Sequence, residues 1–115
     1  MKKTEIIKKN YEFKYFFKKG KYIPGKLLEI FIYQNNNEKN RIGIVVSKKV
    51  GGSVTRNKIK RYIRAAYTEI EEEIKNTSNI LIIWKKNVDS SNANFFDVKE
   101  DLIKIFEKSG ILKEK

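Results

Sequence analysis

Apolar residues along the chain follow two different periods, which predicts a mixture of helices and strands. Residues 10–20 have helical spacing: Asn10 can cap the helix, phenylalanines recur one turn apart, and Gly20 ends it. After a bend at residues 22–25, the segments 27–33 and 42–47 alternate between aliphatic positions and mixed ones, as strands with two unlike faces do. The polar run 34–40 between them predicts a hairpin loop.

The second half of the chain predicts three further elements. A long helix opens at the glycine pair 51–52 and runs to about Asn76, and residues 79–85 are apolar on both faces, as in a central strand. A last helix follows Asn94, which can cap it, and ends at Gly110. A chain of 115 residues is long enough for one core, so residues 1–115 are expected to form a single domain.

The charge balance of the sequence restricts the classes of partner that the protein can be expected to bind. There are 26 Lys and Arg residues against 14 Asp and Glu, a formal charge of +12 and a pI near 9.8. This excess favours a polyanionic partner, although biased codon usage alone would also raise the lysine content. Cysteine and histidine are both absent, which excludes disulfides, Cys/His zinc sites and thiol or imidazole catalysis. The sequence shows no apolar run of about 20 residues and no secretory start, so we expect a cytoplasmic protein without a membrane partner.

The most informative segment is residues 48–64, which contains seven basic residues and no acidic one. On a helical wheel one apolar stripe is predicted to be buried: Ile59, Ile63, Ala66, Tyr67, Ile70 and Ile74. A basic sector borders that stripe, with Lys58 outside it: Arg56, Asn57, Lys60, Arg61 and Arg64. Basic groups beside a buried stripe favour a groove that binds phosphates over a flat patch. The pair Gly51-Gly52 fits either a phosphate contact or a tight turn, and Asn57 either a base contact or a local backbone bond.

The stretch from Ser47 to Arg64 resembles the signature of the bacterial ribonuclease P protein subunit, the family with an Arg-Asn-Arg motif. The resemblance extends to residues 8–13, to Phe17 and Gly20, to residues 41–43 and to the strand before Trp84. The chain departs from the motif at one position, where Lys58 replaces the second arginine and keeps the charge but not the planar fork.

The resemblance implies an α+β fold of order αβββαβα, a two-layer sandwich with a left-handed βαβ crossover. It also implies a catalytic RNA as partner, and precursor tRNA, whose 5′ leader this ribonucleoprotein removes by hydrolysis. Magnesium would be bound mainly by the RNA, with no metal site, catalytic residue or DNA partner on the protein. By matching position, the residues expected to bind RNA are Phe13, Phe17, Phe31, Lys48, Lys49, Arg56, Asn57, Lys58, Lys60, Arg61 and Arg64.

Spacing alone supports part of this set and leaves alternatives open. Phe13 and Phe17 are one helical turn apart and Phe31 lies on the mixed face of its strand, so the three rings could stack on unpaired bases or simply fill the core. A protein-only nuclease would need clustered carboxylates, for which only residues 69–73 are candidates, and a solvated helix face explains these better. A ribosomal or other structural RNA-binding protein would show the same composition.

Overall fold

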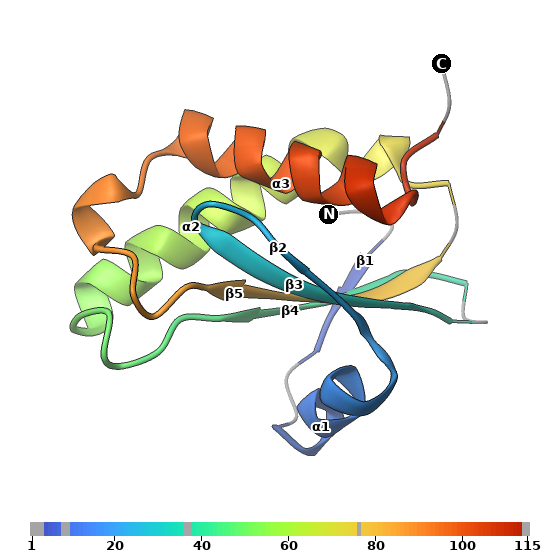
Figure 1. Ribbon diagram of the computed structural model, residues 1–115, viewed down its shortest axis with the longest axis horizontal. Coiled ribbons are helices and arrows are strands. Elements are labelled where there is room, and N and C mark those ends of the chain that lie inside the picture. Colours follow the sequence, from blue (N-terminus) through green and yellow to red (C-terminus); the bar gives the residue numbers. More distant parts are fainter. Residues whose placement is uncertain (1–3, 8–9, 36–37, 76, 114–115) are drawn as a thin grey trace.

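The computed structural model describes residues 4–7, 10–35, 38–75 and 77–113. Three α-helices and five strands follow each other along the chain (Figure 1), with short 3-10 helices at Glu71–Glu73 and Ser90–Asn92. In chain order the elements are β1 (Thr4–Ile6), α1 (Asn10–Lys19), β2 (Lys21–Pro24), β3 (Leu28–Gln34), β4 (Asn40–Val45), α2 (Ser53–Ile70), β5 (Ser78–Trp84) and α3 (Phe95–Ser109). This confirms the predicted α+β class, with β1 added before the first predicted helix.

The strands form one sheet in the order β1-β4-β5-β3-β2, with β5 at its centre. All seven residues of β5 are buried, as the continuous apolar run predicted. β5 pairs in parallel with β4 and antiparallel with β3, so it separates two strands that are neighbours in sequence. The prediction of a hairpin over residues 34–40 is therefore wrong: the segment joins β3 to β4 across the width of β5.

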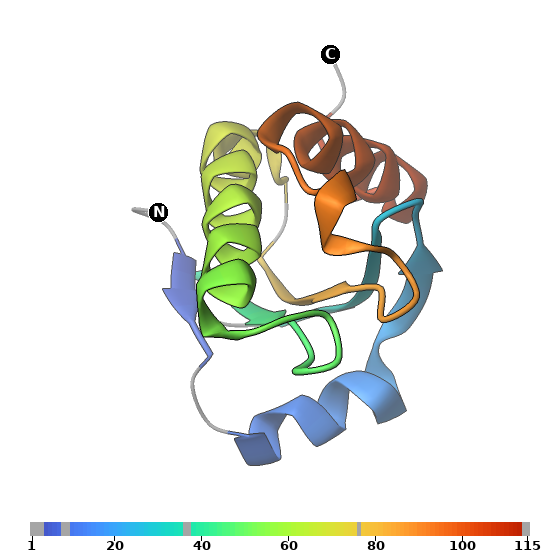
Figure 2. The same cartoon turned by 90° about the vertical axis from the view of Figure 1, so that its left-hand side faces the viewer.

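The βαβ crossover from β4 through α2 to β5 has an uncommon handedness. In Figure 2 both strands run towards the viewer with α2 above the sheet, and β5 lies to the right of β4, so the crossover is left-handed. Parallel crossovers are right-handed in about 98% of cases. This expectation came from the family resemblance and not from any periodicity in the sequence.

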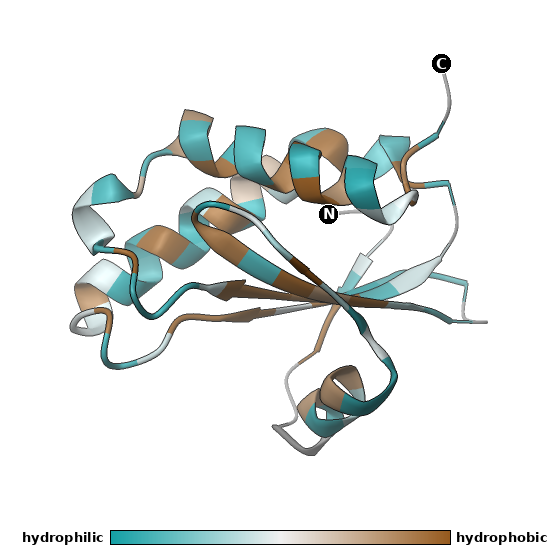
Figure 3. Ribbon diagram, in the orientation of Figure 1, coloured by the Kyte–Doolittle hydropathy of each residue, from teal (hydrophilic) through white to brown (hydrophobic). Residues whose placement is uncertain are grey.

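Helices cover both faces of the sheet. α2 and α3 pack on one face over the larger core, which includes Leu28, Ile30 and Ile82, and α1 crosses the other face over a smaller core around Phe16 and Leu81. Hydrophobic residues accordingly concentrate in β3, β4 and β5 (Figure 3). α1 thus adds a partial third layer to the predicted two-layer sandwich, and the sheet face beside it becomes the setting of the site.

The start of α2 and both ends of α3 lie where the sequence predicted them, whereas the end of α2 does not. α2 begins at Ser53 after the two glycines, the Asn94 side chain accepts a hydrogen bond from the Asp97 N–H at 2.9 Å, and Gly110 ends α3 with a φ of 78°. α2 itself stops at Ile70 and not near Asn76, which lies outside the described residues. The chain turns into a 3-10 helix there, and Ile74 is still buried.

Two buried acidic groups hold these elements together. The Asp101 carboxylate of α3 accepts backbone N–H bonds from residues 26, 27 and 28 at 2.8, 3.0 and 2.9 Å, which fixes the turn between β2 and β3. Glu71 accepts a hydrogen bond from the Thr4 hydroxyl, which also lies 2.8 Å from the Tyr67 hydroxyl. That cluster fastens β1 to the end of α2, and burial is the main cause that raises the pKa of Tyr67 to about 12.

Candidate nucleic-acid interface

α2 separates its apolar and basic residues as the helical wheel predicted. Its buried residues are those of the predicted stripe: Ile59, Ile63, Ala66, Tyr67 and Ile70. In the bordering sector Arg56 and Lys60 are half-buried and Asn57, Arg61 and Arg64 are exposed, as is Lys58 outside it. Arg56 and Lys60 therefore lie beside the core, whereas Lys58, Arg61 and Arg64 face solvent on the same helix.

Local contacts orient two of the arginines. Arg56 Nε donates to the Gly51 carbonyl oxygen at 3.2 Å, which holds the guanidinium against the loop that precedes the helix. The Arg61 guanidinium lies 5.8 Å from the ring centroid of Tyr62. An arginine has five N–H donors, so the single bond to Gly51 leaves Arg56 able to bind a phosphate with its remaining donors.

The loop before α2 presents two further lysines. The Val50 N–H donates to the Ser47 carbonyl at 3.0 Å and the Lys49 N–H to the Ser47 hydroxyl at 3.2 Å, which closes a turn over these residues. Lys48 and Lys49 are both exposed on it. The loop ends at Gly52, which caps α2 without a side-chain hydrogen bond. This arrangement places positive charge from the loop and from the helix at the same end of the sheet (Figure 2).

The phenylalanines of α1 and β3 have different environments. Phe16 is completely buried, whereas Phe17 is 60% exposed and its ring meets Phe31 edge to face with centroids 4.9 Å apart. Phe13 is half-buried against Gly43, where a Cβ atom would come within 2.9 Å of the Phe13 ring. The structure therefore places Phe17 at the surface beside Phe31, and both Phe13 and Phe31 are half-buried against the small core.

α1 is held over the sheet by an ion pair in addition to its apolar contacts. Arg41 Nη2 of β4 lies 2.9 and 3.1 Å from the two carboxylate oxygens of Glu12 on α1. The Gly20 N–H donates to the Phe16 carbonyl at 2.9 Å, and a Cβ atom at Gly20 would clash with that oxygen at 2.5 Å. The helix therefore ends where the chain must turn into β2, and this fixes Phe17 beside Phe31.

Sequence reasoning missed Tyr22, which belongs to the same surface. Residues 22–25 were expected to form a bend, but β2 runs from Lys21 to Pro24 and places Tyr22 directly opposite Phe31, with ring centroids 5.0 Å apart. The signal available in the sequence was the aromatic Tyr22 directly before the aliphatic Ile23. We call Phe17, Tyr22, Phe31 and the neighbouring Glu29 the aromatic surface.

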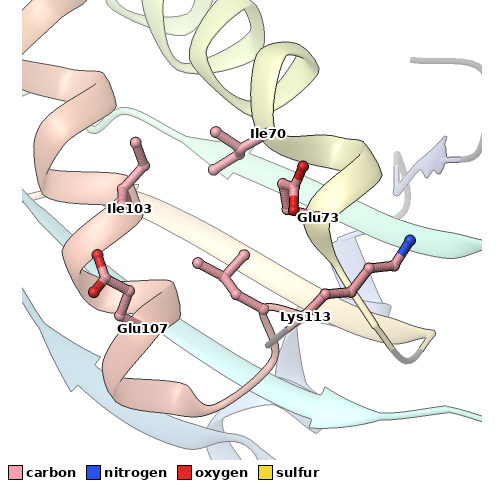
Figure 4. Close-up of a pocket in the computed structure, with 6 residues that line it drawn as sticks. Ile70, Glu73, Ile103, Glu107 and Lys113 are labelled. Carbon is pink, nitrogen blue, oxygen red and sulfur yellow. The ribbon is translucent and has the colours of Figure 1, made fainter. Parts of the chain in front are cut away.

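The basic residues and the aromatic surface lie on different elements. α2 covers one face of the sheet and α1 the other (Figures 1 and 2), so a continuous groove between them remains a prediction. A cavity of about 480 Å³ is elsewhere: it lies between the ends of α2 and α3 and the segment that follows α3 (Figure 4). Its floor is apolar, with Glu73 and Glu107 at its rim.

The acidic run after α2 shows no arrangement suited to metal-dependent hydrolysis. Glu69, Glu72 and Glu73 are exposed, while Glu71 is buried and bonded to Thr4. Across the described ranges, no three acidic side chains gather closely enough to hold a metal ion. None of the helices described is long and apolar enough to cross a membrane.

The known proteins compared with this chain below are all named as ribonuclease P proteins. A family model described as Ribonuclease P matches residues 1–110. A ribonuclease P protein component from Listeria welshimeri is 38% identical over 116 residues, covering 100% of this chain and 96% of that protein. The RNase P protein of Staphylococcus aureus superposes with a TM-score of 0.81 at 28% identity, covering 94% of this chain and 97% of that one. For the RNase P protein from Thermotoga maritima the TM-score is 0.80 at 27% identity, with 90% and 96% covered.

Proposed function

This chain belongs to the ribonuclease P protein family, and we propose that it holds the 5′ leader of precursor tRNA on the aromatic surface while α2 contacts a catalytic RNA. It is the RNA-binding protein subunit of an endoribonuclease ribonucleoprotein of tRNA processing. The observation that carries the proposal is the exposed Phe17 ring beside the half-buried Phe31, in a chain whose helix α2 has basic and no acidic residues from Arg56 to Arg64.

Exposed rings suit a single-stranded leader. Every base has a flat face, so stacking on an aromatic side chain contributes about 1–3 kcal/mol per base with little dependence on sequence. Leaders of different sequence can therefore bind the same surface. Phe17 supports this role because it is 60% exposed although its ring contacts that of Phe31.

The basic side of α2 suits a folded RNA. Arg56, Arg61 and Arg64 provide planar forks for phosphate oxygens, and Lys48, Lys49 and Lys60 add charge that needs no fixed geometry. Lys58 is exposed beside them, so it can still supply the charge of the arginine that it replaces. We assign this surface to the catalytic RNA because its charges extend along the helix instead of gathering around the rings.

The chemistry itself is proposed to belong to the RNA. Hydrolysis of a phosphodiester needs an activated water and charge stabilisation, which magnesium ions supply in such reactions. The chain has neither His nor Cys, and its described acidic residues form no group of three able to hold a metal. Magnesium bound mainly by the RNA is therefore the economical arrangement, with the protein positioning the leader.

Identifying the bound RNA tests the proposal. Crosslinking in cells followed by sequencing should recover one structured RNA, distinct from and far less abundant than ribosomal RNA, and precursor tRNAs with crosslinks in their leaders. Recovery of ribosomal RNA alone would instead indicate a structural ribosomal role. In a parallel assay, the purified protein without RNA should leave precursor tRNA intact, and metal-dependent cleavage at the 5′ junction by nuclease-free protein would contradict the assignment of the chemistry.

A further inference from the structure

The aromatic surface extends beyond Phe17 and Phe31 onto the edge strand β2. Tyr22 pairs with Phe31 across the strands, so both side chains lie on the same face of the sheet as α1. Its ring centroid is 5.0 Å from that of Phe31, and 49% of the residue is exposed. The three rings therefore form a continuous row from α1 to the edge of the sheet, with Phe31 in the middle.

A carboxylate stands at the end of this row. Glu29 lies two residues before Phe31 on β3 and so shares its face, and its Oε2 accepts a hydrogen bond from the Tyr22 hydroxyl at 2.9 Å. That hydrogen bond, together with partial burial and the charge of Glu29, raises the pKa of Tyr22. The Tyr22 hydroxyl is thus the donor of this bond and holds Glu29 in place.

A carboxylate is electrostatically unfavourable on a surface that binds the phosphate backbone of RNA. It accepts hydrogen bonds but cannot donate them, and it repels every phosphate that approaches. In RNA the donors that it can accept from are base N–H groups and the ribose 2′-hydroxyl. A base stacked on Tyr22 or Phe31 would bring its polar edge, and not its phosphate, towards Glu29.

Resting on the function proposed above, we propose that Tyr22, Phe31 and Glu29 form a subsite that recognises a guanine in the leader. The base stacks on the rings, and its adjacent N1–H and N2–H groups donate to the Glu29 carboxylate. Uracil has a single donor between two carbonyl oxygens, which would face the carboxylate unfavourably. Adenine and cytosine offer one amino group each and should rank between the two.

The test is a binding experiment on the protein assembled with its RNA subunit. Precursor tRNAs carry guanine or uracil at one leader position at a time, and leaderless tRNA is measured in parallel. One leader position should prefer guanine by on the order of tenfold, the value of a good bidentate contact. Glu29→Gln should remove most of this preference. Tyr22→Phe, which keeps the ring but loses the bond that orients Glu29, should reduce it, and Tyr22→Ala should also weaken binding of both leaders.

Two matched controls separate this subsite from general effects. Tyr15→Ala removes a tyrosine of similar exposure, 51%, that lies on α1 outside the ring row, and Glu107→Gln neutralises an exposed carboxylate on α3. Both should keep the guanine preference. The inference is overturned if Glu29→Gln retains that preference, or if a 2′-deoxy substitution at the same position abolishes it. If the unaltered protein bound leader-bearing and leaderless RNA with equal affinity, the proposed function itself would be refuted.

Discussion

Replacing Phe17 with alanine separates a ring that binds RNA from a ring that supports the core. Phe17 is 60% exposed, and its ring lies 4.9 Å from Phe31. Full burial of a phenylalanine is worth about 1.5–3 kcal/mol, so the smaller buried part of Phe17 accounts for about 1 kcal/mol, and the ring pair adds about 0.5–1.5 kcal/mol. Phe17→Ala should therefore lower the free energy of unfolding by about 1.5–2.5 kcal/mol.

The same substitution should have a selective effect on RNA binding. Loss of one stacked base costs about 1–3 kcal/mol, which corresponds to about 5-fold to 150-fold weaker binding of precursor tRNA that carries a leader. Binding of leaderless tRNA should stay nearly unchanged. The measurements are thermal or urea unfolding of the variant, and the Kd of the assembled ribonucleoprotein for both RNAs.

The neighbouring Phe16 supplies the control, because it is the same residue type in the same helix but fully buried. Phe16→Ala should cost about 3–5 kcal/mol of folding stability. If Phe17→Ala destabilised the protein as much as Phe16→Ala, Phe17 would belong to the core. If both RNAs lost affinity equally, the stacking argument would fail even with stability preserved.

Three further predictions concern charge and buried polar groups. For binding of the catalytic RNA, Lys60→Ala and Arg64→Ala should each flatten the slope of log affinity against log salt by about 0.7–0.9, whereas Lys108→Ala on α3 should not; equal slopes for all three would refute the assignment of phosphate contacts to α2. Asp101→Asn replaces one of the two carboxylate oxygens, which together accept from three backbone N–H groups, with an NH2 donor; this should cost at least about 2 kcal/mol in urea unfolding, and a neutral result would show that the turn does not depend on the carboxylate. Because the pKa of Tyr67 is raised from 10.0 to about 12, the folded state keeps this proton longer than the unfolded state. Stability linked to Tyr67 should then be full below pH 10.0 and decline as the pH rises towards 12, and Tyr67→Phe should reduce that alkaline decline.

The parts of the structure that the sequence predicted are those set by local periods. The buried stripe of α2 follows from helical spacing sustained over several turns, and β5 from an apolar run with no polar face. The Asn94 cap and the Gly110 stop depend on residues next to the helix they limit. Each of these features needs no knowledge of a distant partner.

The parts that it missed depend on pairing between distant segments. Tyr22 belongs to a strand only because Phe31 lies opposite, and no pattern within residues 21–24 requires it. Likewise, residues 34–40 have the composition of a hairpin loop, but β5 pairs with both neighbouring strands and keeps them apart. The end of α2 at Ile70 was also unpredicted, because the apolar spacing continues to Ile74 after the helix has tightened into a 3-10 turn.

The central place of β5 has a consequence for synthesis of the chain. Within the described residues β4 has no sheet partner other than β1 and β5, and β3 reaches the rest of the sheet only through β5. When residues 4–75 have left the ribosome, the strand pair β1-β4 therefore has no connection to the strand pair β2-β3. At that stage nothing covers the apolar stripe of α2. Cooperative folding of the sheet must wait for residues 78–84. During that interval the basic half of α2 is already exposed, so a nascent chain can attract RNA before it has a core.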